Sequence, residues 1–409
     1  MLKTLAFLAA VTLAIAAIPA LADIPGNKIT IAVLTDLSGG NAVLSGQGSI
    51  AAAQLAAAEA ASILPGITIE VISSDMPPKA DVASAIARGW VASGAVNVIA
   101  DVPFSSAGLA VNDVVRNAPH TIYIASGTGT SDLTGPACSP NTVHWTYDTY
   151  AISQVVARAL LDQGQKSWFF ITADYAFGLA LERDATKTIK ALGGSVVGGV
   201  KNPPFNADFS SYLLTARNSQ ARVIAFANAS VDLINLVKQA HEFGMGHTGP
   251  RLAALLTFIT DVRALGLDAS QGLYLASPFY WDLNDRTRSF RRRVQPLMPV
   301  GHFPNSLHAG NYAAVLHYLK AVKAIGVDAA KASGRASVAR MKMIPTDDDC
   351  FGPGEVRADG RAIHPNYLFQ AKTPAQSKGW DDVLNLLATT PTADAFQQLS
   401  ESACPLIRS

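Results

Sequence analysis

The stretch Lys166–Gly194, KSWFFITADYAFGLALERDATKTIKALGG, decides the fold. It begins with Trp168–Thr172, a short and almost wholly apolar run that is typical of a parallel strand covered on both faces. Ala173–Gly178 interrupts this run with an aspartate, two aromatic residues and a glycine. Apolar residues then recur at helical spacing, and Gly193 and Gly194 end the predicted helix. The stretch therefore predicts a β-strand, a polar loop and an α-helix in succession.

The same succession opens the N-terminal half of the chain. Lys28–Leu34 predicts a strand, Thr35–Gly48 a polar glycine-rich loop, and Ser49–Leu64 an alanine-rich helix that a Pro-Gly pair ends. The two units begin about 140 residues apart in a chain of 409 residues, which indicates two similar α/β lobes. Ligands of open parallel sheets bind where strands lead into loops at their carboxyl ends, so we expect a ligand cleft between the lobes.

The rest of the chain continues this alternation, which is typical of βαβ units and a parallel sheet. Further strands are predicted at Ile67–Ser73, Val96–Ala100, Thr121–Ala125, Ser195–Val200, Arg222–Phe226, Leu252–Leu256 and Tyr367–Ala371. Helices are predicted at Asp81–Ser93, Ala107–Asn117, Ala151–Gln163, Phe209–Ser219, Val231–Phe243, Asp285–Gln295 and Gly310–Ile325. We therefore predict an α/β protein with two doubly wound parallel-sheet lobes.

Three segments outside this alternation predict where the chain crosses between the lobes. They are Val143–Tyr150, Leu273–Trp281 and Gly352–Arg357. The first two are extended and rich in aromatic residues. With these hinge crossings, lobe one comprises residues 28–144 and 280–354, and lobe two comprises residues 147–275 and 358–409.

The N-terminus reads as a signal peptide over residues 1–22. Lys3 gives the positive start, Leu5–Ile18 the apolar region, and Ala20–Ala22 a cleavage site between small residues. The apolar region is shorter than the roughly 20 residues of a membrane span. We therefore expect cleavage after Ala22 and export of the mature chain, with no cysteine near the cut for a lipid anchor.

Charge and motif content exclude several classes of protein. Without Lys3 the mature chain carries 31 basic and 31 acidic residues, so it lacks the excess of positive charge on which nucleic-acid binding depends. No CxxC or HExxH motif is present, so we expect no metal and no cofactor.

The three cysteines are Cys138, Cys350 and Cys404. In an oxidising compartment we expect two of them to pair and one to stay free. Spacing alone does not choose among the three pairings. We favour Cys138–Cys404, which would tie the C-terminal tail to the segment before the first crossing.

Three motifs in order resemble signature stretches of the periplasmic solute-binding proteins that serve ABC importers, in the leucine/isoleucine/valine-binding (type I) family. They are Asp36–Gly39 (DLSG), Asp174–Gly178 (DYAFG) and Ala207–Leu213 (ADFSSYL). The resemblance covers nearly the whole mature chain. It implies a periplasmic protein that closes on a small ligand by hinge motion, delivers it to permease subunits in the inner membrane and catalyses no reaction. We expect it to act as a monomer.

Three further stretches are most similar to the branch of this family that captures aromatic carboxylates, such as benzoate and hydroxycinnamates. They are DVPFSSAGLAV from Asp101, CSPNTVHWTYDTYA from Cys138 and FYWDLND from Phe279. The resemblance therefore implies a small aromatic carboxylate as the ligand. A branched-chain amino acid, an amide or urea is the alternative within the family.

The resemblance also implies the positions of ligand contacts. In lobe one they fall on Ser105, Ser106, Gly127 and Thr128. In lobe two an aromatic contact falls on Phe177, with Tyr175 nearby, and a further contact falls around Asn228–Ser230. Other rings that we expect against the ligand are Tyr147, Phe258, Tyr280 and Trp281.

Two departures from the family pattern bear on the ligand. Amino-acid binders of the family place an acid in lobe two for the α-ammonium group, whereas the matching stretch here is Leu256–Phe258 and contains none. Phe177 replaces their tyrosine. Both departures favour a ligand that presents a carboxylate and a ring only.

The residue types in lobe one suit a carboxylate. Ser105, Ser106 and Thr128 bring hydroxyl groups, and the glycine-rich turn Ser126–Thr130 exposes backbone N–H groups. The helix predicted to begin near Ala107 adds its positive end. The alternative is that one of the two serines only caps this helix.

Enzyme interpretations fit the sequence less well. Gly46-x-Gly48-x-x-Ala51 matches the dinucleotide-binding fingerprint of an NAD-dependent oxidoreductase by letter. However, about eleven residues separate the first strand from Gly46, whereas the fingerprint follows its strand directly. The acidic candidate, Asp75, also lies further from these glycines than the ~20 residues that the fingerprint requires. The sequence also lacks the GxSxG motif that is typical of serine hydrolases.

Overall fold

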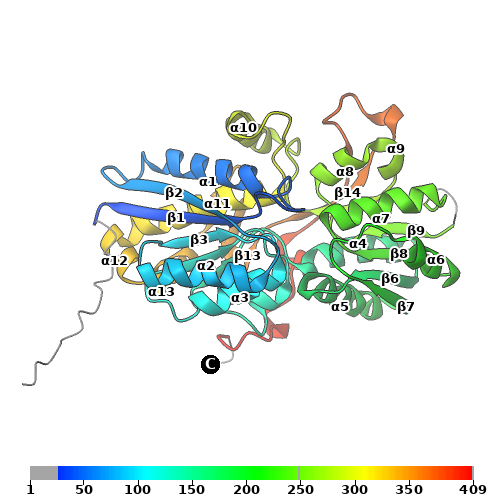
Figure 1. The fold of residues 1–409 in the computed structure, drawn as a ribbon, viewed down its shortest axis with the longest axis horizontal. Helices are drawn as coiled ribbons and strands as arrows, with labels where there is room; N and C mark the ends of the chain where they lie inside the picture. The colour runs from blue at the N-terminus through cyan, green and yellow to red at the C-terminus, as the bar shows by residue number, and fades with distance from the viewer. Residues whose placement is uncertain (1–25, 247–248, 408–409) are drawn as a thin grey trace, which may run out of the picture.

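The computed structural model describes residues 26–246 and 249–407, which form two α/β lobes side by side (Figure 1). The predicted signal peptide and its cleavage site lie outside the described residues. Among the residues described, no helix has both the length and the apolar character that crossing a membrane requires.

Lobe one contains a five-stranded parallel sheet in the order β2-β1-β3-β4-β5. Its strands are β1 (Lys28–Thr35), β2 (Thr68–Asp75), β3 (Val98–Asp101), β4 (Ile122–Ala125) and β5 (Thr142–His144). Its helices are α1 (Gly46–Ala60), α2 (Ala80–Ser93), α3 (Ser105–Val115), α10 (Asp285–Val294), α11 (Ser306–Ile325), α12 (Val327–Ala332) and α13 (Gly334–Met343).

The alternation of β1 explains how this sheet is covered. Ile29, Ile31 and Val33 belong to one core cluster together with α1 and α11. Ala32 and Leu34 point to the opposite face and belong to a second cluster together with α2 and α3. Both faces of the strand are therefore buried, and this is why its sequence is apolar at almost every position.

Lobe two contains a seven-stranded sheet in the order β15-β14-β10-β9-β8-β6-β7. Its strands are β6 (Ser167–Ala173), β7 (Ser195–Asn202), β8 (Val223–Ala227), β9 (Arg251–Ala254), β10 (Tyr274–Ser277), β14 (Asn366–Ala371) and β15 (Leu384–Thr390). Its helices are α4 (Thr149–Asp162), α5 (Ala176–Ala191), α6 (Ser210–Asn218), α7 (Ser230–Glu242), α8 (Ile259–Leu265) and α9 (Leu267–Ser270).

The stretch that predicts the fold forms the centre of this second sheet. In β6, Trp168 and Phe170 pack into one core cluster, and Phe169 and Ile171 pack into the cluster on the opposite face. The α/β class with two doubly wound lobes is thus confirmed. Lobe two adds a feature outside the prediction, because β14 runs antiparallel to both β10 and β15.

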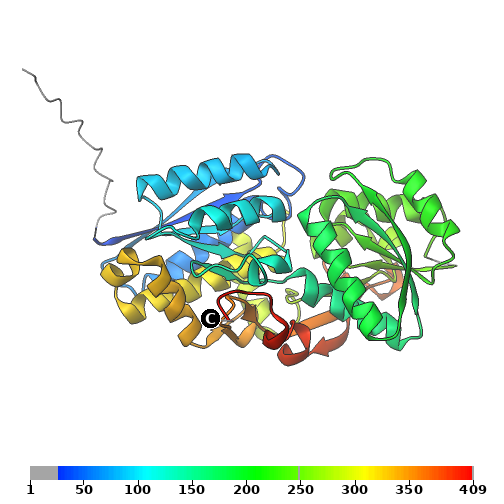
Figure 2. The same ribbon diagram turned by 90° about the horizontal axis from the view of Figure 1, so that it is seen from below.

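The chain passes between the sheets three times (Figure 2). The passages are residues 145–148, 278–284 and 364–365, between β5 and α4, β10 and α10, and β13 and β14. The predicted segment Leu273–Trp281 includes the passage but begins as β10. The prediction for Gly352–Arg357 is wrong, because these residues include β12 (Gly352–Val356), which pairs with β11 (Thr346–Asp348) and β13 (Ala362–Ile363) in a small antiparallel sheet.

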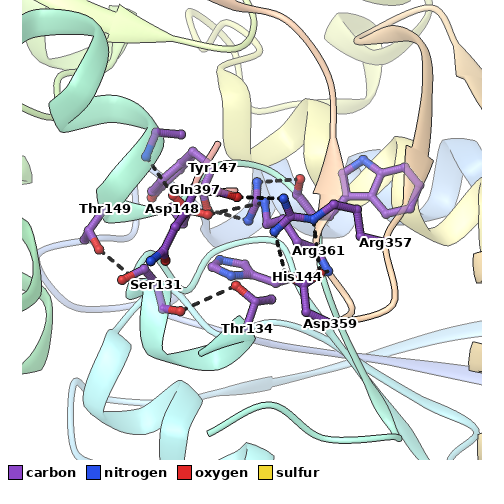
Figure 3. Close-up of polar contacts among 12 residues, drawn as sticks. Ser131, Thr134, His144, Tyr147, Asp148, Thr149, Arg357, Asp359, Arg361 and Gln397 are labelled. Atoms are coloured by element: carbon purple, nitrogen blue, oxygen red, sulfur yellow. Dashed lines mark hydrogen bonds and ion pairs between the residues drawn. The ribbon is translucent and has the colours of Figure 1, made fainter. Parts of the chain in front are cut away.

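Arg361, which directly precedes β13, holds the first of these passages in a cluster of polar residues (Figure 3). Its fully buried guanidinium donates to the carbonyl oxygens of Tyr147 at 3.0 Å and Trp145 at 3.1 Å, and lies 3.5 Å from the carboxylate of Asp148. Burial lowers the pKa of Arg361 to about 10. Asp148 also caps α4, since its side chain accepts from the N–H of Ala151 at 2.7 Å.

The C-terminal tail returns to lobe one. A disulfide joins Cys138 and Cys404, and Cys350 is free and buried. The hydroxyl of Ser402 donates to the carbonyl oxygen of Thr134 at 3.2 Å beside this bond. The last residues therefore contact lobe one, although the expected division of the chain places them in lobe two.

Candidate functional site

A pocket lies between the two lobes, with about 470 Å³ of empty space including the solvent at its mouth. Its lining residues are Asn41, Leu44, Pro103, Phe104, Ser105, Gly127, Gly129, Tyr147, Tyr175, Phe177, Pro204, Phe205, Ala229, Asp232, Leu256 and Phe258.

Nearly all of these residues follow the carboxyl end of a parallel strand. In lobe one they come after β1, β3, β4 and β5, and in lobe two after β6, β7, β8 and β9. The two sets of strand ends face each other across the pocket, as expected for the ligand cleft of two open sheets.

Three of the longer helices begin at the pocket. The N-cap residues of α3, α5 and α7 are Phe104, Tyr175 and Ala229, and all three line it. None of these side chains caps its helix. The first N–H groups of a helix have no acceptor within the helix, and its N-terminus carries a partial positive charge. The pocket therefore favours an anion, although none of the described residues lining it is Lys, Arg or His.

Aromatic rings from both lobes form the walls. Phe104 of lobe one stacks on Tyr175 of lobe two with ring centroids 4.5 Å apart and an interplanar angle of 5°. The ring centroid of Phe205 lies 6.3 Å from that of Phe104, and the ring centroid of Phe258 lies 5.9 Å from that of Tyr147. A flat apolar group fits such walls, since aromatic rings prefer stacked or edge-to-face partners.

Ser105 and Ser106 differ in position although they are adjacent in sequence. Ser105 lines the pocket and is 2% exposed, and its oxygen accepts from the N–H groups of Gly129 at 3.3 Å and Thr130 at 3.2 Å. Its own proton is therefore free to be donated to another acceptor. Ser106 is half-buried and does not line the pocket. Neither serine is the N-cap of α3, which is Phe104.

Six of the residues expected to contact the ligand line the pocket: Ser105, Gly127, Tyr147, Tyr175, Phe177 and Phe258. The others lie elsewhere. The hydroxyl of Thr128 donates to the carbonyl oxygen of Val102 at 2.7 Å and pairs with the hydroxyl of Tyr123. The amide of Asn228 binds Ile171 and Asn202 within lobe two.

The rings expected from the second passage also lie away from the pocket. Trp281 packs under the guanidinium of Arg291, whose central carbon lies 3.7 Å from the ring centroid. The hydroxyl of Tyr280 donates to the carbonyl oxygen of Asp381 at 3.3 Å. Both rings therefore stabilise the region around the hinge.

Contacts between the lobes flank the pocket and hold it closed. Ser230 donates from its hydroxyl to the carbonyl oxygen of Gly40 in lobe one at 2.9 Å. On another side Arg183 of α5 pairs with Asp132 of lobe one at 2.8 Å. Ser230 thus joins the lobes beside the pocket and is not among the residues that line it.

Sequence reasoning missed Phe104 and Asp232. Phe104 directly precedes Ser105, and the aromatic composition of DVPFSS could have indicated it. Asp232 lies in the first turn of α7, is 5% exposed and has a pKa that burial raises to about 6. The absence of an acid at Leu256–Phe258 therefore does not leave lobe two without a carboxylate in the pocket.

Two expectations concern groups other than the ligand. Among residues 26–246 and 249–407, no cluster of three or more His, Cys, Asp or Glu side chains could hold a metal ion. Gly46 begins α1, and ten residues separate it from the end of β1 at Thr35. This geometry differs from the tight strand-to-helix turn of a dinucleotide site.

Comparisons with known proteins agree with this architecture. A sequence profile of the periplasmic binding protein family matches residues 28–379. A crystal structure of a periplasmic binding protein from Burkholderia mallei is 39% identical, with a TM-score of 0.88, and the match covers 93% of this chain and 99% of that one.

Two further relatives carry names that mention amino acids. A branched-chain amino acid ABC transporter periplasmic ligand-binding protein from Burkholderia xenovorans is 35% identical, with a TM-score of 0.81 over 93% of this chain and 100% of that one. Leu/Ile/Val-binding protein homolog 6 of Brucella suis is 27% identical over 341 residues, which are 81% of this chain and 84% of the relative.

Proposed function

The chain belongs to the periplasmic binding protein family and is the substrate-binding component of an ABC transporter, and from this premise we propose that its ligand is a small aromatic carboxylate. Members of this family are periplasmic solute-binding proteins, not enzymes. A small molecule in the pocket and a permease are the partners that such a component requires.

One observation carries the proposal. The pocket combines aromatic walls from both lobes with three helix N-termini, and its described lining includes no basic side chain. The rings suit a flat apolar body, and the N-termini with the Ser105 hydroxyl suit a carboxylate.

The magnitudes show that both parts are needed. Burial of a ring of ~200 Å² at ~25 cal/mol per Å² gives roughly 5 kcal/mol. Micromolar affinity needs about 8 kcal/mol before the costs of association. Two or three charge-assisted hydrogen bonds of ~1.5–3 kcal/mol each supply the difference. Because the closed lobes surround the ring while the open ones do not, the ligand shifts the population towards closure.

A branched-chain amino acid is the second candidate. The observation that favours it is Asp232, a carboxylate of lobe two in the pocket. An α-ammonium group could pair with it, and the names of the Burkholderia xenovorans and Brucella relatives mention such ligands. The aromatic walls, which suit a flat ring better than a branched aliphatic side chain, favour the aromatic acid.

Ligand-induced thermal stabilisation tests the choice. We expect purified mature protein to be stabilised by benzoate, 4-hydroxybenzoate or coumarate, because a ligand that binds only the folded state raises Tm. Leucine, glutamate and urea are the comparison ligands. Stabilisation by leucine without any effect of an aromatic acid would refute the ligand assignment and leave the family assignment intact.

We also propose that export removes residues 1–22 and that the mature protein is a monomer. The positively charged start, the apolar region and the small-x-small site support the cleavage. The intact mass of the periplasmic protein tests the first point, since cleavage after Ala22 leaves Asp23 as the N-terminal residue. Light scattering tests the second.

A further inference from the structure

Asp232 is the one acidic side chain among the described residues that line the pocket. It projects from the first turn of α7 in lobe two. One of its oxygens accepts from the N–H of Phe205 at 2.9 Å, and the other accepts from the N–H of Asn206 at 2.7 Å. The carboxylate thus fixes the loop whose Phe205 ring reaches Phe104 of lobe one.

These two hydrogen bonds leave capacity unused. A carboxylate has about four acceptor positions, and here each oxygen has one hydrogen bond. Burial opposes the charged form, and the groups that favour it are the N–H groups of Phe205 and Asn206. A buried acceptor with unfilled positions in a ligand pocket favours a ligand that brings a donor to it.

We propose that Asp232 accepts a hydrogen bond from a hydroxyl group on the aromatic ring of the ligand, so that the protein selects hydroxylated aromatic carboxylates. This inference rests on the proposed function and narrows its substrate class. The ring hydroxyl that donates to Asp232 lies at the end of the ring opposite the ligand carboxylate, because two carboxylates repel each other when close.

The arrangement fixes the orientation of the ligand. Its carboxylate meets Ser105 and the N-terminus of α3 in lobe one, and its ring hydroxyl meets Asp232 in lobe two. Each polar end thus contacts a different lobe, and both contacts form together only when the lobes are closed. An unsubstituted ring leaves Asp232 without its additional donor, and a methoxy group presents an acceptor to an acceptor.

Isothermal titration calorimetry at pH 7.5 tests the inference with 4-hydroxybenzoate, benzoate and 4-methoxybenzoate. We expect wild-type protein to bind 4-hydroxybenzoate roughly 10- to 100-fold more tightly than benzoate, as for a hydrogen bond to a charged acceptor, and to bind 4-methoxybenzoate more weakly than benzoate. This ranking needs no variant, so the test does not depend on the folding of any mutant.

The variant Asp232→Asn identifies the acceptor. The measured quantity is the ratio of the Kd for benzoate to the Kd for 4-hydroxybenzoate, which we expect to fall several-fold. A disturbed Phe205 loop would weaken both ligands alike and would leave this ratio unchanged. Asp174→Asn is the matched control, because Asp174 follows β6 in the same lobe, is exposed and does not line the pocket, and its ratio should equal that of the wild type.

The outcomes separate the two levels of the argument. Binding of benzoate without a preference for 4-hydroxybenzoate, or a preference that Asp232→Asn retains, overturns the inference and leaves the proposed function standing. Binding of leucine together with no binding of any aromatic acid overturns the proposed function and the inference with it.

Discussion

Replacement of Ser105 by alanine removes the hydroxyl of a residue that lines the pocket, and Ser106→Ala provides a matched control one residue away. Both changes delete one oxygen from the first turn of α3. Only Ser105 lines the pocket. The pair therefore tests whether position in the pocket, rather than general chemistry of this helix end, determines binding.

The structure sets the expected magnitude. The Ser105 oxygen already accepts from Gly129 and Thr130, so its single proton is available to a ligand carboxylate. A hydrogen bond to a charged group contributes ~1.5–3 kcal/mol, so Ser105→Ala should weaken the binding of an aromatic acid roughly 10- to 100-fold. The N–H groups of Gly129 and Thr130 lose an acceptor at 3.2–3.3 Å, which costs stability of about 1 kcal/mol.

Calorimetric titration with the best ligand of the thermal screen measures both variants against the wild type. We expect Ser106→Ala to change Kd by less than about 2-fold, because surface changes stay within roughly 0.5 kcal/mol. Thermal unfolding without ligand should show both variants folded, with Tm within about 4 °C of the wild type. Equal losses of affinity in the two variants, or full affinity in Ser105→Ala, would contradict the assigned geometry.

Three further predictions concern stability. Cys404→Ala should lower the unfolding free energy by ~2–5 kcal/mol, because the Cys138–Cys404 bond closes a loop with a sequence separation of 266, and reductant should lower the Tm of the wild type but not of the variant. Burial raises the pKa of Asp261 to about 7, so the folded state holds a proton that the unfolded state releases near pH 4. This contribution favours folding at low pH and is lost as the pH rises through 7. Denaturant unfolding should therefore show that Asp261→Asn gains stability relative to the wild type between pH 4.5 and pH 8. A difference in unfolding free energy that stays constant with pH would refute the raised pKa. Arg361→Met should lower the unfolding free energy by ~3–5 kcal/mol, because it leaves Asp148 buried without its partner. Adding Asp148→Asn should recover part of this stability. A double variant no more stable than the single one would exclude the loss of this ion pair as the cause.

The sequence predicted the lobes well because their strands are buried on both faces. In β6, residues pointing in both directions must be apolar, so the run Trp168–Thr172 is distinct in the sequence. The short strands near the hinge were less clear. β5 and β10 have three and four residues, within segments that also pass between the lobes, and their pairing depends on partners remote in sequence.

The glycines explain the error at Gly352–Arg357. A glycine-rich stretch between helical and extended patterns is typical of a flexible passage. Here Gly354 lies so close to the neighbouring strand that a Cβ would meet the Ile363 carbonyl oxygen at 2.3 Å. Its small size thus serves the pairing of β12 with β13, a close approach of two backbones that local sequence does not reveal.

The candidate site was predictable where motif and strand end coincide, and obscure where helix phase decides. Ser105 and Ser106 are chemically identical, and a helix start placed at Ala107 gives no reason to separate them. Once α3 begins at Ser105, about 100° of rotation per residue turns one hydroxyl to the pocket and the other away. Asp232 likewise depends on helix phase, because only the rotation of α7 shows that it reaches the pocket.

The contacts between the lobes bear on affinity as directly as the ligand contacts do. The Phe104–Tyr175 stack and the Ser230–Gly40 hydrogen bond join the lobes through protein groups alone. They stabilise the closed state in the absence of ligand, and the apparent Kd is the intrinsic Kd divided by the fraction of protein that is closed. The rings of the pocket therefore act twice, since Phe104 and Tyr175 line the site and also determine how often it is assembled.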